Sequence, residues 1–487
     1  MAVPRSRAGR SAIVGAILSF ILPGAGQAYV GDWSRAAFFG IPAVIGLLLA
    51  ARELGQGVSH VAARLLDPAV AVGLLLLIVL LAAWRAWSVV HAWRVGRRTL
   101  GGAILMPVLL ALIVGMHGFA FITTASMLGA GERIASDGDS LLEPVPPAFG
   151  ATPAPSSRLP AGGVTATGDP QALPSAPPSS TLAPGEDPYE QYDDEPEPRV
   201  VAGPRPGYDV AAIDTQADGL LNVLIVGIDW KPGRDSRRTD SMIVVSVNTE
   251  TGEVYMFSFP RDISHFPMYN GGTYEGKLNG FASYANRHPG QFPDGGLKSL
   301  GYQLGFLLGI PIDYYAAVDI PGFEKVVEAV GGVTVNNPKA INDTYIDGGK
   351  GFHLPAGKHR LNAADALRYV RSRHGSSDFA RAQRQQQVLS ALRREMTKPD
   401  QIGNLPSIMD AISGVLRTDF PRDRLTELIK LSEKVSDEPT NGYVFRPPTW
   451  ATFTPRTETT RSITQLRVER LRELSLELFG EKSLYNR

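Results

Sequence analysis

The chain has 487 residues, equal numbers of acidic and basic side chains, and no cysteine. A neutral chain offers no overall basic field for nucleic acid, and a chain without cysteine has no disulfides, thiolate metal sites or cysteine nucleophiles. The length allows two or three domains. Changes in composition predict three parts: a membrane region (1–130), a linker (131–217) and a folded C-terminal domain (218–487).

The first part contains four apolar stretches. A helix that crosses a bilayer needs about 20 apolar residues; the fourth stretch exceeds this easily, the third is long enough, and the second is short. The first stretch is interrupted by Pro23 and Gly24, which break a helix near its middle. The four stretches cover residues 11–30, 36–50, 68–84 and 101–129.

Positive charge predicts the orientation of these segments. Basic loops stay on the cytoplasmic side, and Arg85, Arg94, Arg97 and Arg98 precede the last stretch, with further arginines at the N-terminus. The C-terminal domain is then extracytoplasmic and the number of crossings is odd. We therefore predict a multi-pass cell-membrane protein with three spans, in which 11–30 is a re-entrant or interfacial hairpin. Four spans with an outside N-terminus is the alternative.

The linker has a distinct composition. Residues 141–206 alternate Pro with Ala, Ser, Thr and Gly and then gather acidic residues. Such a segment buries too little apolar surface to fold, and its prolines favour a partly extended spacer. We predict that it holds the C-terminal domain off the membrane.

The C-terminal domain begins with strands and continues with helices. The apolar, β-branched runs are typical of buried strands, and the Gly-containing turn at 249–252 predicts a hairpin. Strands followed by helices predict an α/β fold, a three-layer α/β/α domain around a mixed central sheet. The expected strands are 222–228, 242–247 and 254–259, and the expected helices are 297–308, 323–330, 363–369 and 380–396.

Charged residues stand at the ends of the predicted strands. Asp229 follows the first strand directly, Asp240 precedes the second, and Arg261 follows the third. Ligand sites in open α/β sheets lie at strand ends, so these three groups are expected to converge.

A second charged group comes later in the chain. Arg371 and Arg373 follow one predicted helix, and a short loop with Asp378 leads into the next. On that next helix, the residues three or four apart share one face. They are Arg381, Arg384 and Gln385.

Both groups combine arginine with aspartate. The guanidinium fork suits phosphate oxygens, and aspartate oxygens are ligands that Mg²⁺ prefers. Phosphoryl transfer needs mainly positioning and neutralisation of charge. A phosphate site follows from this pattern, although ordinary surface ion pairs would also explain any single Arg–Asp pair.

Several stretches of the domain closely resemble the LytR-CpsA-Psr family and occur in the family's order. Together they cover about 220–395 and are far more specific than any one short motif. They are NVLIVGID (222–229), RRTDSMIVVSVN (237–248), FSFPRD (257–262), KLNGFASYA (277–285), GIPIDYYAAVDIPGFEKVVEAVGGVTV (309–335), LNAADALRYVRSR (361–373) and DFARAQRQQQVLSAL (378–392).

The resemblance implies a glycopolymer–peptidoglycan phosphotransferase of cell wall assembly. Members of this family bind a glycan linked to polyprenyl pyrophosphate, whose lipid tail lies in a hydrophobic tunnel under the sheet. They transfer the glycopolymer phosphate to peptidoglycan, with Mg²⁺ as cofactor and polyprenyl phosphate as leaving group. The expected partners are therefore the lipid-linked glycan, the peptidoglycan acceptor and the bilayer.

The family's motifs assign roles to individual positions. Asp229 and Asp240 resemble the metal-site aspartates, and the catalytic group comprises Asp240, Arg238 and Arg261. The loop is expected to be ordered by Asp378. The pyrophosphate ligands implied by the resemblance are Arg238, Arg261, Arg371, Arg373, Arg381 and Gln385.

Three positions leave the assignment open. The family often has a second arginine where this chain has Ser236, and either Arg234 or Arg237 would have to replace it. Lys277 and Asn279 match another shared motif and are as compatible with a structural role as with the site.

The rest of the chain, 396–487, is expected to complete the same domain, with helices at 422–435 and 464–479. Two other functions stay open. One is hydrolysis by a polyprenyl pyrophosphate phosphatase, which would use the same pyrophosphate ligands with water as acceptor. The other is a membrane-tethered regulator that binds polyprenyl phosphate without chemistry; the sequence has no helix-turn-helix or basic stripe for DNA.

Overall fold

The fold is taken from a computed structural model of the whole chain. It describes residues 11–95, 100–133, 141–142, 197–206, 210, 219–230, 237–373, 378–421, 424–435, 441–454 and 463–486. Most of the predicted linker, and with it the predicted spacer role, lies outside the described residues.

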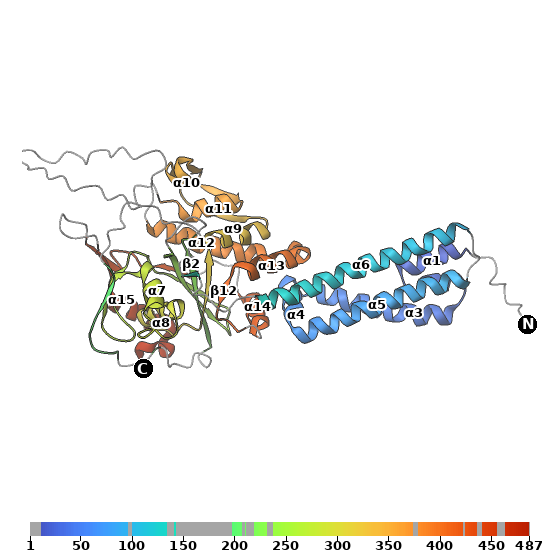
Figure 1. Cartoon of the computed structure of the whole chain (residues 1–487), viewed down its shortest axis with the longest axis horizontal. Coiled ribbons are helices and arrows are strands. Elements are labelled where there is room, and N and C mark those ends of the chain that lie inside the picture. Colours follow the sequence, from blue (N-terminus) through green and yellow to red (C-terminus); the bar gives the residue numbers. More distant parts are fainter. Residues whose placement is uncertain are drawn as a thin grey trace, which may run out of the picture.

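The N-terminal region is a bundle of helices that extends away from the C-terminal domain (Figure 1). Three of its helices are long and apolar enough to cross a membrane, namely Trp33–Gly55, Pro68–Val95 and Ile104–Ala130, which agrees with the predicted number of spans. The helices are α1 (Ala12–Ile21), α2 (Ala25–Tyr29), α3 (Trp33–Gly55), α4 (Val58–Leu66), α5 (Pro68–Val95) and α6 (Leu100–Arg133).

The first apolar stretch folds back on itself at the expected point. Gly24 has φ 96° between α1 and α2, a conformation that suits glycine. The buried Gln27 accepts a hydrogen bond from Ser19 Oγ (2.9 Å) and donates to the Ser88 carbonyl of α5 (2.8 Å). Because buried polar groups need such partners, these bonds fix the hairpin against α5.

A six-stranded mixed sheet forms the centre of the C-terminal domain. β2 pairs antiparallel with β3 and parallel with β7, so the ends of β2 and β7 and the start of β3 lie at one edge. The predicted hairpin joins β3 to β4. The strand order is β12 (Arg417–Thr418), β7 (Tyr314–Asp319), β2 (Leu220–Ile228), β3 (Thr239–Asn248), β4 (Val254–Ser258) and β13 (Asn441–Val444).

The main hydrophobic core covers one face of this sheet. Alternate residues of the strands, such as Leu224, Val244 and Phe257, are fully buried there. A small sheet of β1 (Arg199–Val201), β5 (Ser264–Pro267) and β6 (Thr273–Lys277) adds Phe266 and Tyr274 to the same core. The helices that complete it are α7 (Leu278–Arg287), α8 (Gly296–Leu308) and α15 (Val468–Phe479).

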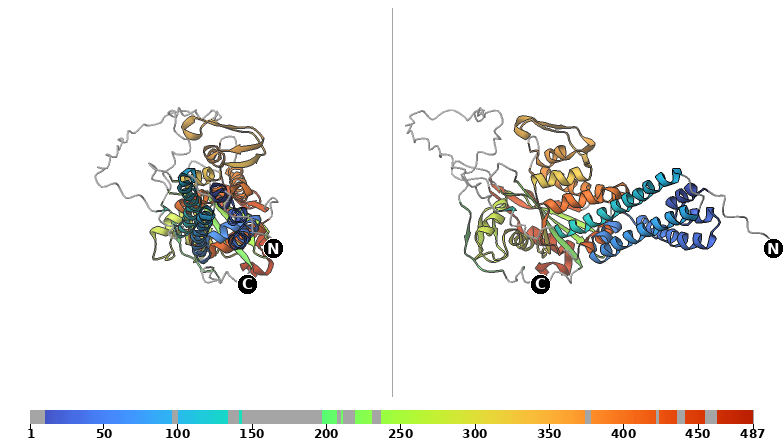
Figure 2. Two further views of the ribbon diagram at one scale, coloured as in Figure 1. Left: turned by 90° about the vertical axis from the view of Figure 1, so that its right-hand side faces the viewer. Right: turned by 45° about the vertical axis from the view of Figure 1, so that its right-hand side comes forward.

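Other helices lie toward the opposite face and surround a second core, which includes Val335, Tyr369 and Val388. α12 contacts β3, β4 and β13, and α9 contacts β7. Figures 1 and 2 show α10 and α11 furthest from the sheet on this side. The elements are α9 (Ile320–Ala329), β8 (Val333–Asn337), β9 (Ile341–Asp343), α10 (Ile346–Gly349), β10 (Phe352–Leu354), β11 (Gly357–Leu361), α11 (Ala363–Arg371) and α12 (Asp378–Met396).

The mixed sheet with helices confirms the predicted α/β class. The C-terminal remainder returns to this domain, since β13 pairs with β4. The helix predicted from residue 464 was placed too early, because Ile463–Leu466 pairs as β15 with β14 (Ala451–Thr454) before α15 starts at Val468. The remaining elements are η4 (Pro399–Asn404), α13 (Leu405–Val415), α14 (Leu425–Lys434), η6 (Gly480–Lys482) and η7 (Leu484–Asn486).

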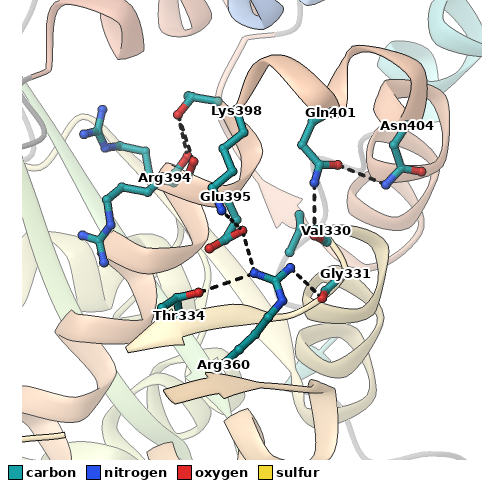
Figure 3. Close-up of polar contacts among 11 residues, drawn as sticks. Val330, Gly331, Thr334, Arg360, Arg394, Glu395, Lys398, Gln401 and Asn404 are labelled. Atoms are coloured by element: carbon teal, nitrogen blue, oxygen red, sulfur yellow. Dashed lines mark hydrogen bonds and ion pairs between the residues drawn. The ribbon is translucent and has the colours of Figure 1, made fainter. Parts of the chain in front are cut away.

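A polar network holds the C-terminal end of α9, where helix carbonyls lack partners within the helix. Asn404 donates to the Ala329 carbonyl (2.5 Å), Gln401 to the Val330 carbonyl (3.3 Å) and Arg360 to the Gly331 carbonyl (2.9 Å). Figure 3 shows these side chains converging from η4 and β11. The network thereby connects η4 to α9.

The membrane region and the C-terminal domain share an apolar contact. Val58, Ala62 and Leu66 of α4 and Met127 and Ala130 of α6 form one cluster with the domain. The domain contributes Leu405 and Met409 of α13, together with the partly buried Ile402 and Ile429. We call these residues the junction cluster. The described part of the domain is therefore in direct contact with the membrane helices.

Candidate phosphate site at the sheet edge

The two predicted metal-site aspartates lie at the same edge of the sheet. Asp229 follows β2, and its backbone N–H donates to the Arg238 carbonyl (2.9 Å). Ile228 pairs with Thr239, across a bulge, so Asp240 follows directly on the neighbouring strand. Bulges are frequent beside functional sites because they redirect side chains. The strand-end argument thus places Asp229, Arg238 and Asp240 together.

Arg261 joins this group from the end of β4. Its Nη1 donates to Asp240 Oδ2 at 2.7 Å, and its Nε lies 3.7 Å from Asp262. The side chains of Arg261 and Asp240 are 19% and 26% exposed, so the pair is shielded but open to a ligand. Lys277 lies 3.3 Å from the same Asp262. A shielded, charge-assisted pair of this kind is pre-organised toward incoming negative charge.

Helix α12 brings the second predicted group to this edge. Gln385 accepts a hydrogen bond from Oγ of Ser241 (3.1 Å), which is the residue after Asp240. Gln385 also donates to the Val370 carbonyl (3.5 Å). Arg381 lies four residues before Gln385 on the same helix face and is buried. Gln385 thus connects β3 to the end of α11.

Two buried residues order the turn that carries Arg371 and Arg373. Asp343 accepts hydrogen bonds from Ser372 Oγ and from the Arg373 backbone N–H, each at 2.9 Å. Arg384 donates through Nε to the Tyr369 carbonyl (2.8 Å) and through Nη2 to the Ser372 carbonyl. The turn is therefore fixed to both β9 and α12.

Neither ordering residue was assigned that role from the sequence. Asp378 was expected to order this loop, but its side chain lies outside the described residues. Asp343 stands in a segment that carries no motif, and only the fold brings it to the turn. Arg384 shared a helix face with Arg381, which was the one available signal.

Burial shifts the pKa of two groups here. It lowers the pKa of Arg384 and raises the pKa of Tyr369 to about 12. Arginine nevertheless stays protonated, and tyrosine stays neutral at physiological pH. The Arg384 guanidinium also lies 5.7 Å from the Tyr369 ring centroid. Both groups therefore have a constant charge state and serve as a fixed support.

Other predicted residues lie differently. Arg371 Nη1 is 4.0 Å from Asp347 in α10, an ion pair on the side of the second core. Arg237 donates to the Leu141 carbonyl (2.9 Å) and covers the Trp230 ring at 4.8 Å, which is a packing role. Arg234 and Ser236 lie outside the described residues.

Asn279 and Lys277, from another shared motif, lie next to the segment that carries Arg261. The backbone of Asn279 links two strands, because its N–H donates to the Arg261 carbonyl (3.1 Å) and its carbonyl accepts from Thr239 Oγ1 (3.2 Å). Its side chain is buried. Asn279 thus supports the segment that carries Arg261, whereas the position of Lys277 beside Asp262 is compatible with either role.

Few of the described side chains at this edge could bind a metal ion. Among the described residues no group of three or more His, Cys, Asp or Glu side chains could hold an ion. Asp229 and Asp240 supply two carboxylates at one edge, and Mg²⁺ commonly takes one or two carboxylates with water and phosphate oxygens. The residues present thus fit Mg²⁺ only together with a phosphate ligand.

An apolar strip leads away from these charges on the α12 side of the sheet. Val223 and Ile225 of β2, Val245 of β3 and Val318 of β7 alternate with the core-facing residues and are only partly buried. Within the described residues, the second core takes no member from the six-stranded sheet. Ile243 of β3 faces the same side and is only 3% exposed, so the fold covers this strip in part.

Comparison with known proteins matches this domain to one family. The model of the LytR_cpsA_psr family matches residues 191–443. The regulatory protein MsrR of Staphylococcus aureus is 35% identical over 208 residues, 42% of this chain and 58% of that protein. The teichoic acid transferase TagU of Halalkalibacterium halodurans, whose full name is polyisoprenyl-teichoic acid–peptidoglycan teichoic acid transferase, is 31% identical over 220 residues, 45% of this chain and 66% of that protein. The matches thus span less than two thirds of these relatives.

The solved structures that are similar to this chain include those of TagV and TagT. The crystal structure of B. subtilis TagV gives a TM-score of 0.44 at 23% identity, over 55% of this chain and 98% of that chain. The structure of TagT bound to LIIa-WTA gives a TM-score of 0.42 at 23% identity, over 56% of this chain and 93% of that chain.

Proposed function

Because the chain belongs to the LytR_cpsA_psr family, we propose that it transfers a glycopolymer phosphate from a polyprenyl pyrophosphate carrier to peptidoglycan. The observation that carries this proposal is the pairing of Arg261 with Asp240 beside Asp229, with Gln385 bonded to the next residue of the strand. TagU, a relative at 31% identity, is named as a teichoic acid transferase that acts on peptidoglycan.

We propose that four of the predicted arginines hold the pyrophosphate from two sides. Arg238 and Arg261 belong to the strand ends, and Arg373 and Arg381 belong to the α11–α12 side. Arginines on opposite sides can neutralise both phosphoryl groups while fixing the angle between them. The apolar strip of Val223, Ile225, Val245 and Val318 gives a polyprenyl tail a surface to cover, since burial of apolar area is favourable.

The reaction would form one bond to phosphorus and break another. The acceptor hydroxyl oxygen attacks the phosphorus that carries the glycan, the pyrophosphate P–O bond breaks, and polyprenyl phosphate leaves. The hydroxyl proton passes to a carboxylate, for which Asp240 is the candidate, since arginine cannot accept a proton. Arg261 stabilises the charge that develops on the leaving phosphate. Mg²⁺, held by Asp229 and Asp240 with phosphate oxygens, would add positive charge at the same point.

The arrangement of the helices supports an extracytoplasmic domain. The last turn of α5, which carries Arg94, and the start of α6 lie at the end of the bundle far from the domain (Figure 1). α4, which connects two spans, lies at the domain end and contacts it. With basic residues on the cytoplasmic side, we propose that the domain and α4 both lie outside the cytoplasm.

The test is reconstitution of the full chain in vesicles with a lipid-linked glycan and peptidoglycan fragments. We expect a covalent glycan–peptidoglycan conjugate from the wild type, and a loss of at least about 100-fold in Arg261→Ala because a charge-stabilising donor is removed. Arg470→Ala is the matched control, since Arg470 forms an exposed pair with Glu473 on α15. Release of free glycan phosphate and polyprenyl phosphate without conjugate would identify a phosphatase, and binding of the lipid without either product would identify a regulator.

A further inference from the structure

We propose that the lipid donor reaches the site through a cavity between the last membrane helix and helices α9 and α13. This inference rests on the proposed function and adds a route by which the lipid donor leaves the membrane. The cavity has a volume of about 490 Å³ and is lined by Arg133 of α6, Lys325 and Ala329 of α9, and Asp410, Gly414 and Val415 of α13. Lys325 and Ala329 lie within a stretch that resembles the family, but the resemblance gave them no role, and Arg133 and the α13 residues lie outside the quoted stretches. We call this cavity the lipid port.

The outer end of the lipid port lies at the membrane surface. The apolar span of α6 ends at Ala130, and Arg133 follows three residues later, where arginine side chains commonly reach the headgroup layer. Arg133 donates to Asp410 of α13 at 2.7 Å. The junction cluster holds α6 against α13 beside this pair. A lipid that leaves the bilayer along α6 therefore meets the lipid port first.

Away from Arg133, the helices that line the lipid port pack against β7 of the central sheet. A Cβ atom at Gly322, in the first turn of α9, would come within 2.9 Å of Val415 and 2.8 Å of Val318, so glycine there allows α9, α13 and β7 to meet closely. Val318 belongs to the partly buried apolar strip. The next residue, Asp319, pairs with Ile228, which precedes Asp229. The lining residue Val415 therefore packs beside β7, the strand next to the one that ends in the predicted metal ligand.

The chemistry of the lining suits passage better than tight retention. Ala329, Ala411 and Val415 give the lipid port small apolar side chains, and Arg133 and Lys325 give it cations. Arg133 is already paired with Asp410, and Glu328 lies one turn from Lys325, so carboxylates moderate the attraction for an anion. A molecule with an apolar chain and a phosphate group meets compatible groups throughout, without an unopposed cluster of cations that would trap it.

Because the chain has no cysteine, a single introduced cysteine can be labelled to block the lipid port after folding. A Cβ atom at Gly414 would meet no atom within 4 Å, so Gly414→Cys fits the backbone, and its thiol is the only one in the chain. A bulky maleimide then fills the lipid port, while methyl methanethiosulfonate adds only a small group. Gly290→Cys is the control, because Gly290 also has open space around its Cα and lies in the α7–α8 loop, outside the cavity lining.

Two lipid donors distinguish an effect on passage through the lipid port from an effect on the reaction itself. With a full-length polyprenyl donor in vesicles, bulky labelling of Gly414→Cys should lower transfer at least about 10-fold, whereas the small label and labelled Gly290→Cys should change it less than about twofold. With a water-soluble short-chain donor, which need not leave a bilayer, all of these proteins should stay within about twofold of each other. Full-length donor in the vesicles should also slow labelling of Cys at 414.

Each other outcome has a distinct meaning. Full activity of the bulky-labelled protein on the vesicle donor would overturn the lipid port and leave the proposed function intact. An equal loss on both donors would also overturn it, because the label would then be acting on the catalytic edge itself. No transfer by the wild type from either donor would refute the proposed function, and the lipid port with it.

Discussion

At the scale of single residues, the turn that carries Arg373 depends on a residue outside the predicted pyrophosphate ligands. Asp343 is buried and holds the Arg373 backbone from a distant strand. A carboxylate that accepts two hydrogen bonds restricts the turn to one conformation. The position of the arginine clamp on the α11 side therefore depends on a residue outside the clamp.

We expect Asp343→Ala to impair donor binding more than chemistry. The variant leaves Ser372 Oγ and the Arg373 N–H without their acceptor, which costs about 1–3 kcal/mol and releases the turn. KM for the lipid donor should rise about 10-fold or more while kcat changes less, and Asp343→Asn, which keeps one acceptor oxygen, should recover part of the loss. Glu469→Ala is the control, since Glu469 forms an exposed pair with Arg472 on α15, far from the turn in the chain. A fall in kcat alone would contradict the positioning role.

The residue scale also shows what the sequence could and could not predict. Asp229, Asp240 and Arg261 were predicted to converge because each stands at a strand end, and adjacent strands bring such ends together. Asp343 could not be found in that way, because its contact with Arg373 spans 30 residues and depends on how β9 packs against α11. Arg237 looked equivalent to Arg238, yet its neighbours Trp230 and Leu141 draw it into packing.

At the scale of elements, the end of α9 is stabilised by a buried acid. Glu395 of α12 is 4% exposed and accepts from Lys398 (2.6 Å) and Arg360 (3.1 Å). Burial alone would raise the pKa of Glu395, but the hydrogen bonds from these two cations outweigh it and hold the pKa below the usual 4.5. Arg360 in turn holds the Gly331 carbonyl after α9, as Figure 3 shows.

The lowered pKa predicts a pH dependence of stability. A carboxyl group with a lower pKa in the folded state stabilises the fold above its unfolded pKa, and this contribution is lost as the pH falls through the folded pKa. Glu395→Gln should therefore lose about 1–3 kcal/mol at neutral pH, and its difference from the wild type should shrink below pH 4.5. Thermal unfolding between pH 3 and 7 measures this, with the exposed Glu473→Gln as control. A difference that persists unchanged at pH 3 would exclude the ionic contribution.

Elements were easier to predict from the sequence than their ends. Apolar runs and helical periodicity located β2, β3, β4, α8 and α12 within a few residues, because these patterns reflect local burial. Residue 464 was assigned to a helix, although β15 occupies it, since a four-residue strand gains its stability from pairing with β14 and leaves little local pattern. The predicted break at Pro23 agreed with the structure because proline and glycine act locally.

At the scale of the whole molecule, the junction cluster makes the membrane region more than an anchor. α4 and α6 bury apolar side chains against α13 and α14, and η4 connects the same contact to the end of α9. The sequence predicted a domain held away from the membrane by a linker. It could not predict this contact, because the residues of α4 and α14 lie far apart in the chain and each carries only an ordinary amphipathic pattern.

Adjacent residues on α14 provide a matched test of this contact. Ile429 packs against the junction cluster, whereas Leu428 is 36% exposed. Ile429→Glu should release the domain from α4, because burying an unpaired carboxylate costs several kcal/mol, and Leu428→Glu should have little effect. Hydrogen exchange of α4 in vesicles measures the release, with faster exchange expected only for Ile429→Glu. Equal exchange in both variants would mean that the two regions do not dock.

The junction cluster also imposes an order on biogenesis. About 360 residues separate α4 from α14, so at about 5–20 residues per second the ribosome needs roughly 20–70 s to produce the second after the first. During that interval the part of α4 that later meets α14 has no surface of the domain to cover it, and an amphipathic helix in that situation lies in the headgroup layer. The newly folded domain must then displace lipid from α4 in order to dock. Assembly therefore ends at the membrane surface with an exchange of lipid contacts for protein contacts.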